Sequence, residues 1–204
     1  MRRVMTAVAL MATLSSASAR AEIIDRILAV VNGAVIMQSD VTMSVQLGLA
    51  PSSAGSNSMA ASLDALIERR LVLEEVDRYA PPDPADTDVD RRLAEVGARA
   101  GTAFDVILRE SGISVDQLRR QVRDDLRIDA YLLQRFGAMQ PSDDEVQQYY
   151  RDHQASFMRN GTLRPLDDVR DVVRAELMAN QRATMIKDWI AGLRRRATIN
   201  VLPR

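Results

Sequence analysis

Few side chains in this sequence have the types and spacing that chemistry requires. The chain contains one histidine, His153, and no cysteine. A histidine that acts as a general base or a metal ligand needs partner side chains, and the neighbouring Asp152 would point to another side of a helix. We therefore interpret His153 as a solvated residue at a helix end. The lack of cysteine excludes disulfides, thiolate metal ligands and a cysteine nucleophile.

Acidic residues give a second candidate for chemistry. Four aspartates lie close together in the sequence, at Asp83, Asp86, Asp88 and Asp90. This run lacks the turn glycine and the closing glutamate of an EF-hand calcium loop. We interpret these carboxylates as part of a linker and a helix start, with calcium binding as the alternative.

Ser39 and Asp40 form the remaining candidate pair. Their side-chain oxygens suit the cap of a helix that begins directly after them, and no base is available to activate the serine as a nucleophile. The sequence also contains no glycine-rich phosphate loop. We therefore expect no catalytic residues, no metal ligands and no cofactor, and we expect that the protein is not an enzyme.

Methionine residues suggest a binding surface. Unbranched thioether side chains adapt to apolar partners of different shapes. Several methionines and leucines flank a serine-rich stretch over residues 51–58. We predict a peptide-binding surface formed by five of them, namely Met37, Met43, Leu47, Leu49 and Met59. The alternative is that these side chains are ordinary core residues.

The composition narrows the class of protein. Hydrophobic residues make up 47% of the chain and charged residues 27%, which is typical of a soluble globular protein. Aromatic residues make up only 4%, which argues against a stacking platform for nucleic acid. We therefore expect no nucleic-acid partner.

The first 21 residues have the pattern of a secretory signal peptide. Arg2 and Arg3 precede an apolar run, Val4–Leu14, and small residues follow it. The run is too short to span a bilayer stably, and a short N-terminal membrane anchor is the alternative. Cleavage after Ala19 or after Ala21 fits the small-residue pattern. We expect an exported, periplasmic protein without stable membrane insertion.

The elements that position these residues begin with a predicted β-hairpin. Asn32-Gly33 separates two β-favouring runs, and both central positions of a type I′ turn need positive φ. The predicted strands are Ile27–Val31 and Ala34–Met37, and a lone two-stranded ribbon is marginal in water. Residues 197–202 alternate apolar and polar side chains. We predict that this C-terminal strand joins the hairpin in one antiparallel sheet.

The rest of the chain has helical periodicity, so the predicted fold class is mainly α: a multi-helix core with a small antiparallel hairpin joined by the C-terminal strand. Capping-box patterns start helices at Ser114 and Ser142. The expected helices cover residues 41–47, 59–79, 87–99, 103–110, 114–136, a segment starting at 142, and 166–196. The last would be about 45 Å long, so we expect a bend near Asn180 or an overhang.

Three motifs in a fixed order resemble a known family. The first covers Ala29–Val41 and contains the Asn-Gly turn. The second covers Pro141–Phe157, and the third begins at Leu166–Arg170 and ends at Ala197–Ile199. Their order and spacing resemble SurA-type periplasmic folding factors and the related parvulin-type foldases. The resemblance implies that residues 22–204 form a SurA-like chaperone core, in which residues 82–137 either pack on the rest or form a satellite lobe.

The sequence departs from this family at one place. The resemblance places a parvulin isomerase module of roughly domain size between Phe157 and Leu166, where this chain has only the short bridge 158–165. It therefore implies an ATP-independent holdase for unfolded, outer-membrane polypeptides without isomerase activity. The outer-membrane assembly machinery is a further candidate partner. The alternatives are an envelope adaptor subunit that binds one folded partner and, least favoured, a prolyl isomerase.

Overall fold

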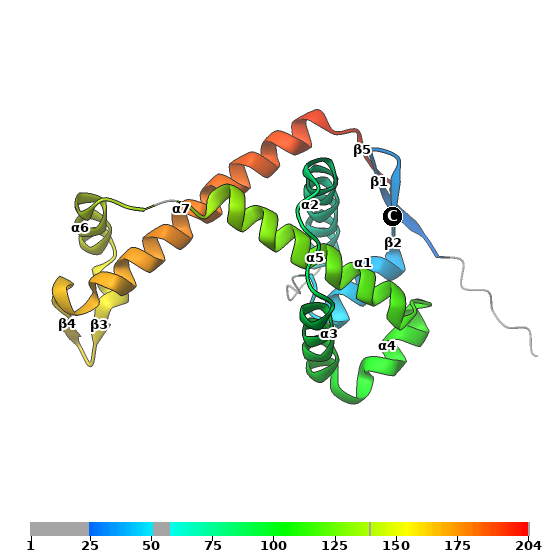
Figure 1. Ribbon diagram of the computed structural model, residues 1–204, viewed down its shortest axis with the longest axis horizontal. Coiled ribbons are helices and arrows are strands. Elements are labelled where there is room, and N and C mark those ends of the chain that lie inside the picture. Colours follow the sequence, from blue (N-terminus) through cyan, green and yellow to red (C-terminus); the bar gives the residue numbers. More distant parts are fainter. Residues whose placement is uncertain (1–24, 51–57, 139, 204) are drawn as a thin grey trace, which may run out of the picture.

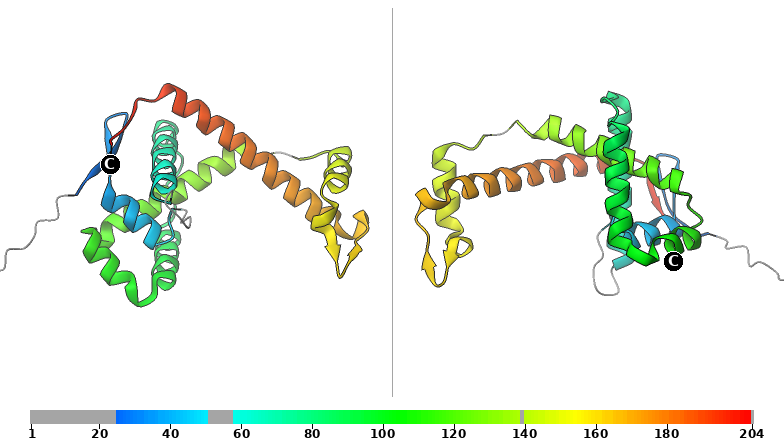
Figure 2. Two further views of the ribbon diagram at one scale, coloured as in Figure 1. Left: turned by 180° about the vertical axis from the view of Figure 1, so that it is seen from behind. Right: turned by 60° about the horizontal axis from the view of Figure 1, so that its bottom comes forward.

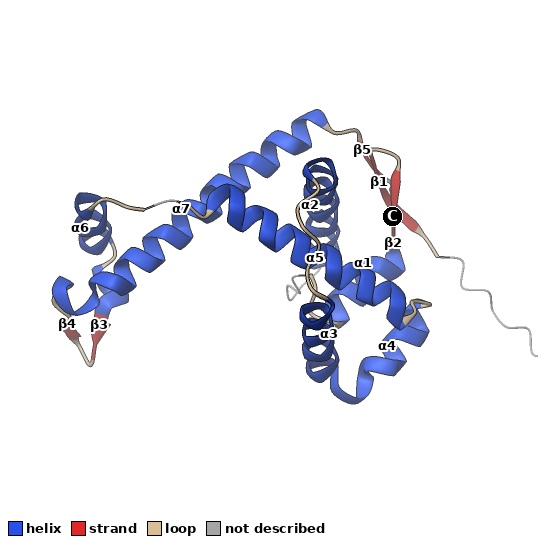
Figure 3. Cartoon of the chain, viewed as in Figure 1, coloured by secondary structure: helices blue, strands red, loops and turns tan. Residues whose placement is uncertain are grey.

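The computed structural model describes residues 25–50, 58–138 and 140–203. The expected signal peptide lies outside them, as does most of the serine-rich stretch. Helices dominate the described chain, and strands are confined to two small sheets (Figure 3). The prediction of a mainly α fold with a small antiparallel sheet is confirmed. Among the described residues, no helix is both long and apolar enough to cross a membrane.

The three-stranded sheet brings the two ends of the described chain together. Strand β1 (Ile27–Val31) pairs with β2 (Ala34–Met37) through the Asn32-Gly33 turn, whose φ values are 47° and 90°. Strand β5 (Ile199–Val201) pairs antiparallel with the other edge of β1, which gives the order β2-β1-β5. The predicted hairpin and its C-terminal partner strand are both confirmed.

The helices around this sheet form a body with two apolar clusters. In the first cluster, the inner face of the sheet packs on α2 (Ser58–Tyr79), α5 (Val115–Phe136) and the last turns of α7 (Leu166–Arg196). The second cluster joins α1 (Gln38–Gln46), α3 (Asp86–Ala100), α4 (Phe104–Ser111) and α5. A short 3₁₀ turn, Gly101–Ala103, connects α3 to α4. The helices of residues 82–137 therefore pack on α1 and α2.

A second, smaller unit stands away from the body, and we call it the distal lobe. It consists of α6 (Asp143–Asp152), the 3₁₀ turn Gln154–Phe157, the hairpin β3 (Met158–Arg159) with β4 (Thr162–Leu163), and the first half of α7. Its own cluster contains Val146, Phe157, Val169, Val173 and Leu177. Helix α7 runs without interruption from this lobe to the body (Figures 1 and 2). The long helix thus overhangs the body and has no break near Asn180.

The helix starts confirm two capping predictions and correct a third. The Ser114 hydroxyl accepts from Gln117 N at 3.2 Å, and the second capping box, at Ser142, has the same arrangement. Helix α1, however, begins at Gln38, so Ser39 and Asp40 lie inside its first turn. There the Asp40 carboxylate accepts from Met37 N at 2.9 Å, and the Ser39 hydroxyl donates to Asp25. Because β2 runs directly into α1, the side chain that caps the helix belongs to its third residue, Asp40, and not to a residue before the helix.

Candidate functional site

The structure places the five residues of the predicted peptide-binding surface in different environments. Met43 and Leu47 are each only 1% exposed and lie in the middle of the second apolar cluster. Leu49 packs half-buried against that cluster, Met59 packs against the first cluster, and Met37 is half-buried where β2 meets α1. The five side chains do not share one open face, and their role in binding stays a prediction.

Three of the four aspartates considered for calcium face arginines of α5, and the fourth, Asp88, pairs with Arg91 of its own helix at 2.8 Å. Arg119 pairs with Asp90 and lies 3.6 Å from Asp86, and Arg123 lies 2.5 Å from Asp86. Arg127 lies 3.4 Å from Asp83. A cation at this place would have to displace guanidinium groups from the carboxylates. Within the described ranges, no three histidine, aspartate or glutamate side chains are arranged to hold a metal ion.

His153 lies at the C-terminal end of α6 and is exposed. Its ring stacks on Tyr149 with 4.0 Å between ring centroids, and its Nδ1 lies 2.9 Å from the Tyr149 carbonyl oxygen. These contacts suit a residue that terminates a helix. Both contacts join the ring to Tyr149, one turn earlier in the same helix.

The candidate site is the middle of α7, where two hollows open beside the helix. The larger, of about 600 Å³, is lined by Gln140, Pro141, Glu145, Asn180, Gln181, Thr184 and Met185. The smaller, of about 230 Å³, is lined by Phe136, Gly137, Ala175, Met178, Ala179 and Arg182. Both lie where the ends of the connection from α5 to α6 run along α7. The larger has the volume of a typical ligand pocket.

Contacts between α6 and α7 fix the wall of the larger hollow. Asn180 donates to the Tyr149 hydroxyl at 2.7 Å, and Gln181 donates to Glu145 at 3.2 Å. Hydrogen bonds from the backbone and side chain of Ser142 lower the pKa of Glu145, because they stabilise its carboxylate. The hollow therefore has a negative charge on its rim at neutral pH and an apolar methionine, Met185, along its wall.

Phe136, which lines the smaller hollow, belongs to an aromatic cluster of the body. This cluster contains four of the eight aromatic residues in the chain, Tyr79, Tyr131, Phe136 and Trp189. The Arg135 guanidinium lies over the rings of Phe136 and Trp189, 5.5 and 5.4 Å from their centroids. Such aromatic contacts add to apolar burial. They hold Phe136 in position at the wall of the hollow.

Met178 and Met185 were not among the predicted binding residues. Helical periodicity predicted the helix over residues 166–196 but not which of its turns lack a packing partner. The informative signal was the length of α7, because a helix longer than a compact domain must leave part of its surface uncovered. Met185 is 36% exposed, and it lies between the helical turns that pack in the distal lobe and those that pack in the body.

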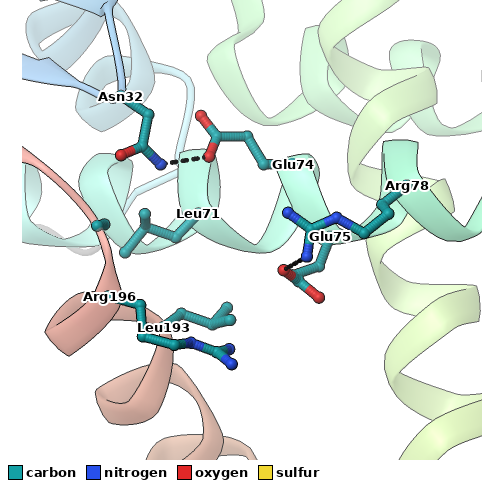
Figure 4. A pocket seen from close by; sticks show the side chains of 8 residues that line it. Asn32, Leu71, Glu74, Glu75, Arg78, Leu193 and Arg196 are labelled. Atoms are coloured by element: carbon teal, nitrogen blue, oxygen red, sulfur yellow. Dashed lines mark hydrogen bonds and ion pairs between the residues drawn. The ribbon is translucent and has the colours of Figure 1, made fainter.

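A further cavity lies where the hairpin turn meets α2 and the end of α7 (Figure 4). It measures about 230 Å³, and Arg78, Glu75 and Arg196 contribute to its polar lining. Asn32 connects its walls. The Asn32 side chain donates to Glu74 at 2.6 Å and accepts from Thr198 N at 2.8 Å. The turn residue thus joins the hairpin to both α2 and the C-terminal strand.

Comparison with known proteins supports the predicted resemblance. No protein-family model and no curated protein sequence matches the chain. A solved structure does match it, from a study of PEB4 and the periplasmic protein Cj1289, described as two structurally related SurA-like chaperones of Campylobacter jejuni. The TM-score is 0.56 at 15% sequence identity, and the match covers 88% of this chain and 100% of the other. The chain therefore has the fold of the SurA-like chaperones.

Proposed function

We propose that this protein is an ATP-independent chaperone that holds unfolded polypeptides against the hollows along the middle of α7. The observation that carries the proposal is the exposed, methionine-bearing surface of α7 between the body and the distal lobe. The SurA-like fold supports a chaperone role, and it favours a non-enzymatic function. The activity would be binding alone.

The driving force is burial of apolar client side chains. Burial stabilises by about 25 cal/mol per Å², or roughly 1.5–3 kcal/mol for one leucine or phenylalanine side chain. Met178 and Met185 can adjust their rotamers to clients of different shape. The amides of Gln140, Asn180 and Gln181 at the larger hollow offer donors and acceptors to an extended backbone. Single weak contacts of this kind permit rapid release.

The location and the clients are further parts of the proposal. The signal-peptide pattern of the first 21 residues supports export to the periplasm, and unfolded outer-membrane polypeptides are the proposed clients. The half-buried Met37, Leu49 and Met59 would add contacts near α1. Met43 and Leu47 could contribute only if α1 separated from α3 and α4, because both side chains are buried between those helices.

The test measures the aggregation of a chemically denatured substrate diluted into buffer with the chain from residue 22 onward. The wild type should suppress aggregation, and Met185→Glu should weaken suppression at least about fivefold, since a charge in the hollow opposes apolar burial. Met158→Glu is the matched control, because Met158 is 52% exposed in β3 and lines neither hollow. The absence of suppression by the wild type at several-fold molar excess would refute the proposal.

A further inference from the structure

Strand β5 forms an open edge of the three-stranded sheet. The order β2-β1-β5 leaves one side of β5 without a neighbouring strand among the described residues. Thr198 and Leu202, on either side of β5, form 2.9 Å hydrogen bonds with the β1 hairpin. Bonded and unbonded pairs alternate in an antiparallel ladder. The backbone N–H and C=O groups of Ile199 and Val201 therefore point away from β1, toward the open side.

This edge has one of the protections that sheet edges usually carry, because β5 is only three residues long. Charges, prolines, bulges and covering segments are the other usual protections. Strand β5 contains no charged residue and no proline, and Val201 and the adjoining Leu202 are 58% and 40% exposed. The opposite edge, at β2, offers fewer free backbone groups. Only Val35 presents its backbone outward there, and the outward N–H of Met37 is already bonded to Asp40. The open β5 edge is thus the better template for an added strand.

The direction of an added strand determines where its end lies. A strand antiparallel to β5 runs in the same direction as β1, so its carboxyl end approaches the turn at Asn32. The cavity of about 230 Å³ in Figure 4 adjoins this turn and the start of β5. A terminal carboxylate bound there would meet the side chains that line this cavity.

The charges in the cavity leave one arginine available. Glu74 is occupied by Asn32 at 2.6 Å and by Arg70 at 3.1 Å, and Glu75 pairs with Arg78 at 2.7 Å. Arg196 also lines the cavity, and it forms no ion pair within the ranges that the structure describes. Its guanidinium can bind a carboxylate through two parallel hydrogen bonds.

We propose that the β5 edge binds the extended, apolar carboxyl-terminal segment of a polypeptide as an added antiparallel strand, with the terminal carboxylate at Arg196. Main-chain hydrogen bonds to Ile199 and Val201 supply affinity, and side chains facing Val201 and Leu202 supply apolar contact. This surface is separate from the hollows along α7. A variant that loses peptide binding at the β5 edge therefore says nothing against the hollows along α7, and the reverse also holds.

The probe is a short synthetic peptide of alternating valine and threonine with a free carboxyl terminus, together with its amidated twin. Val201→Pro removes an outward N–H and keeps every ladder bond to β1, because edge positions tolerate proline. We expect it to raise the Kd of the free-acid peptide at least about tenfold, equivalent to about 1.4 kcal/mol. Val201→Thr retains the N–H and is the matched control, with a Kd within about threefold of wild type.

Arg196→Gln tests the carboxylate contact without altering the strand. It should raise the Kd of the free-acid peptide about fivefold and leave the amidated peptide unchanged. Equal affinity of the wild type for both peptides would overturn the carboxylate assignment. Unchanged binding by a folded Val201→Pro variant would overturn the edge assignment. A third outcome would also overturn the proposal: the wild type binds no peptide but forms a dimer, and Val201→Pro converts that dimer to a monomer. The edge would then pair with a second copy of the chain.

Discussion

Replacing Asn32 by glycine should loosen the connection between the two ends of the described chain. Asn32 occupies the left-handed region, with φ of 47°, and its side chain bonds both Thr198 N and Glu74. Glycine keeps this backbone conformation without strain, so Asn32→Gly removes the side-chain bonds while the turn can keep its shape. Each bond contributes about 0.5–1.5 kcal/mol, and the flexibility of glycine in the unfolded chain adds about 0.5–1 kcal/mol. The free energy of unfolding should fall by about 1.5–4 kcal/mol.

A pair of substitutions at Asn32 and Glu74 measures the Asn32–Glu74 bond separately from the Asn32–Thr198 bond. Asn32→Asp retains an oxygen acceptor for Thr198 N and tolerates positive φ, but it places a second carboxylate against Glu74. We expect a loss of about 1–2 kcal/mol at neutral pH. Adding Glu74→Gln returns a donor to the pair, so the double variant should be more stable than Asn32→Asp alone.

Urea unfolding followed by the fluorescence of Trp189 measures these changes, because the indole packs against the first apolar cluster of the body. A free energy of unfolding of Asn32→Gly within about 0.5 kcal/mol of wild type, the range of ordinary surface substitutions, would show that the Asn32 side chain does not connect the two ends. A double variant no more stable than Asn32→Asp would contradict the contribution of the Glu74 bond.

Three further perturbations test other parts of the body. Ser114→Ala breaks the capping box of α5 and should cost about 1 kcal/mol in urea unfolding. Arg127→Ala removes a guanidinium with three aspartate partners and should cost about 1–2 kcal/mol at low salt and less at high salt, whereas the exposed Arg91→Ala should cost under about 0.5 kcal/mol. Burial raises the pKa of Asp125 above 3.8, although Arg69 opposes the rise. The folded state then binds this proton more tightly than the unfolded chain, so ionisation of Asp125 lowers stability as pH rises from 3.8 through the raised pKa. Asp125→Asn should flatten that segment of a stability-against-pH profile; an unchanged slope would contradict the assignment.

Local signals predicted most elements of the fold. Asn32-Gly33 specified the turn because few residues accept positive φ, and the capping boxes at Ser114 and Ser142 marked the starts of two helices. The alternation over residues 197–202 identified the third strand. Its pairing with the hairpin could be inferred because two strands alone would have left the ribbon unsupported.

The candidate site was harder to predict because exposure depends on what packs against each side chain. Methionine type alone could not separate the core residue Met43 from Met185, which remains 36% exposed. The prediction that Ser39 and Asp40 cap α1 from in front of the helix was wrong for a similar reason, since both residues lie in its first turn and only the Asp40 carboxylate binds the N-cap backbone. The start of α1 depends on the strand before it, and a sequence pattern does not show where the backbone of Met37 lies.

The sequence by itself determined the turn, the helix starts and the alternation of the last strand, since each depends on conformational preferences within a few residues. Only the tertiary structure decided that α7 leaves its middle uncovered, that Asn32 reaches both Glu74 and Thr198, and that β5 keeps an open edge. These features depend on contacts between segments far apart in the chain, and packing free energies between such segments are not encoded in local propensity.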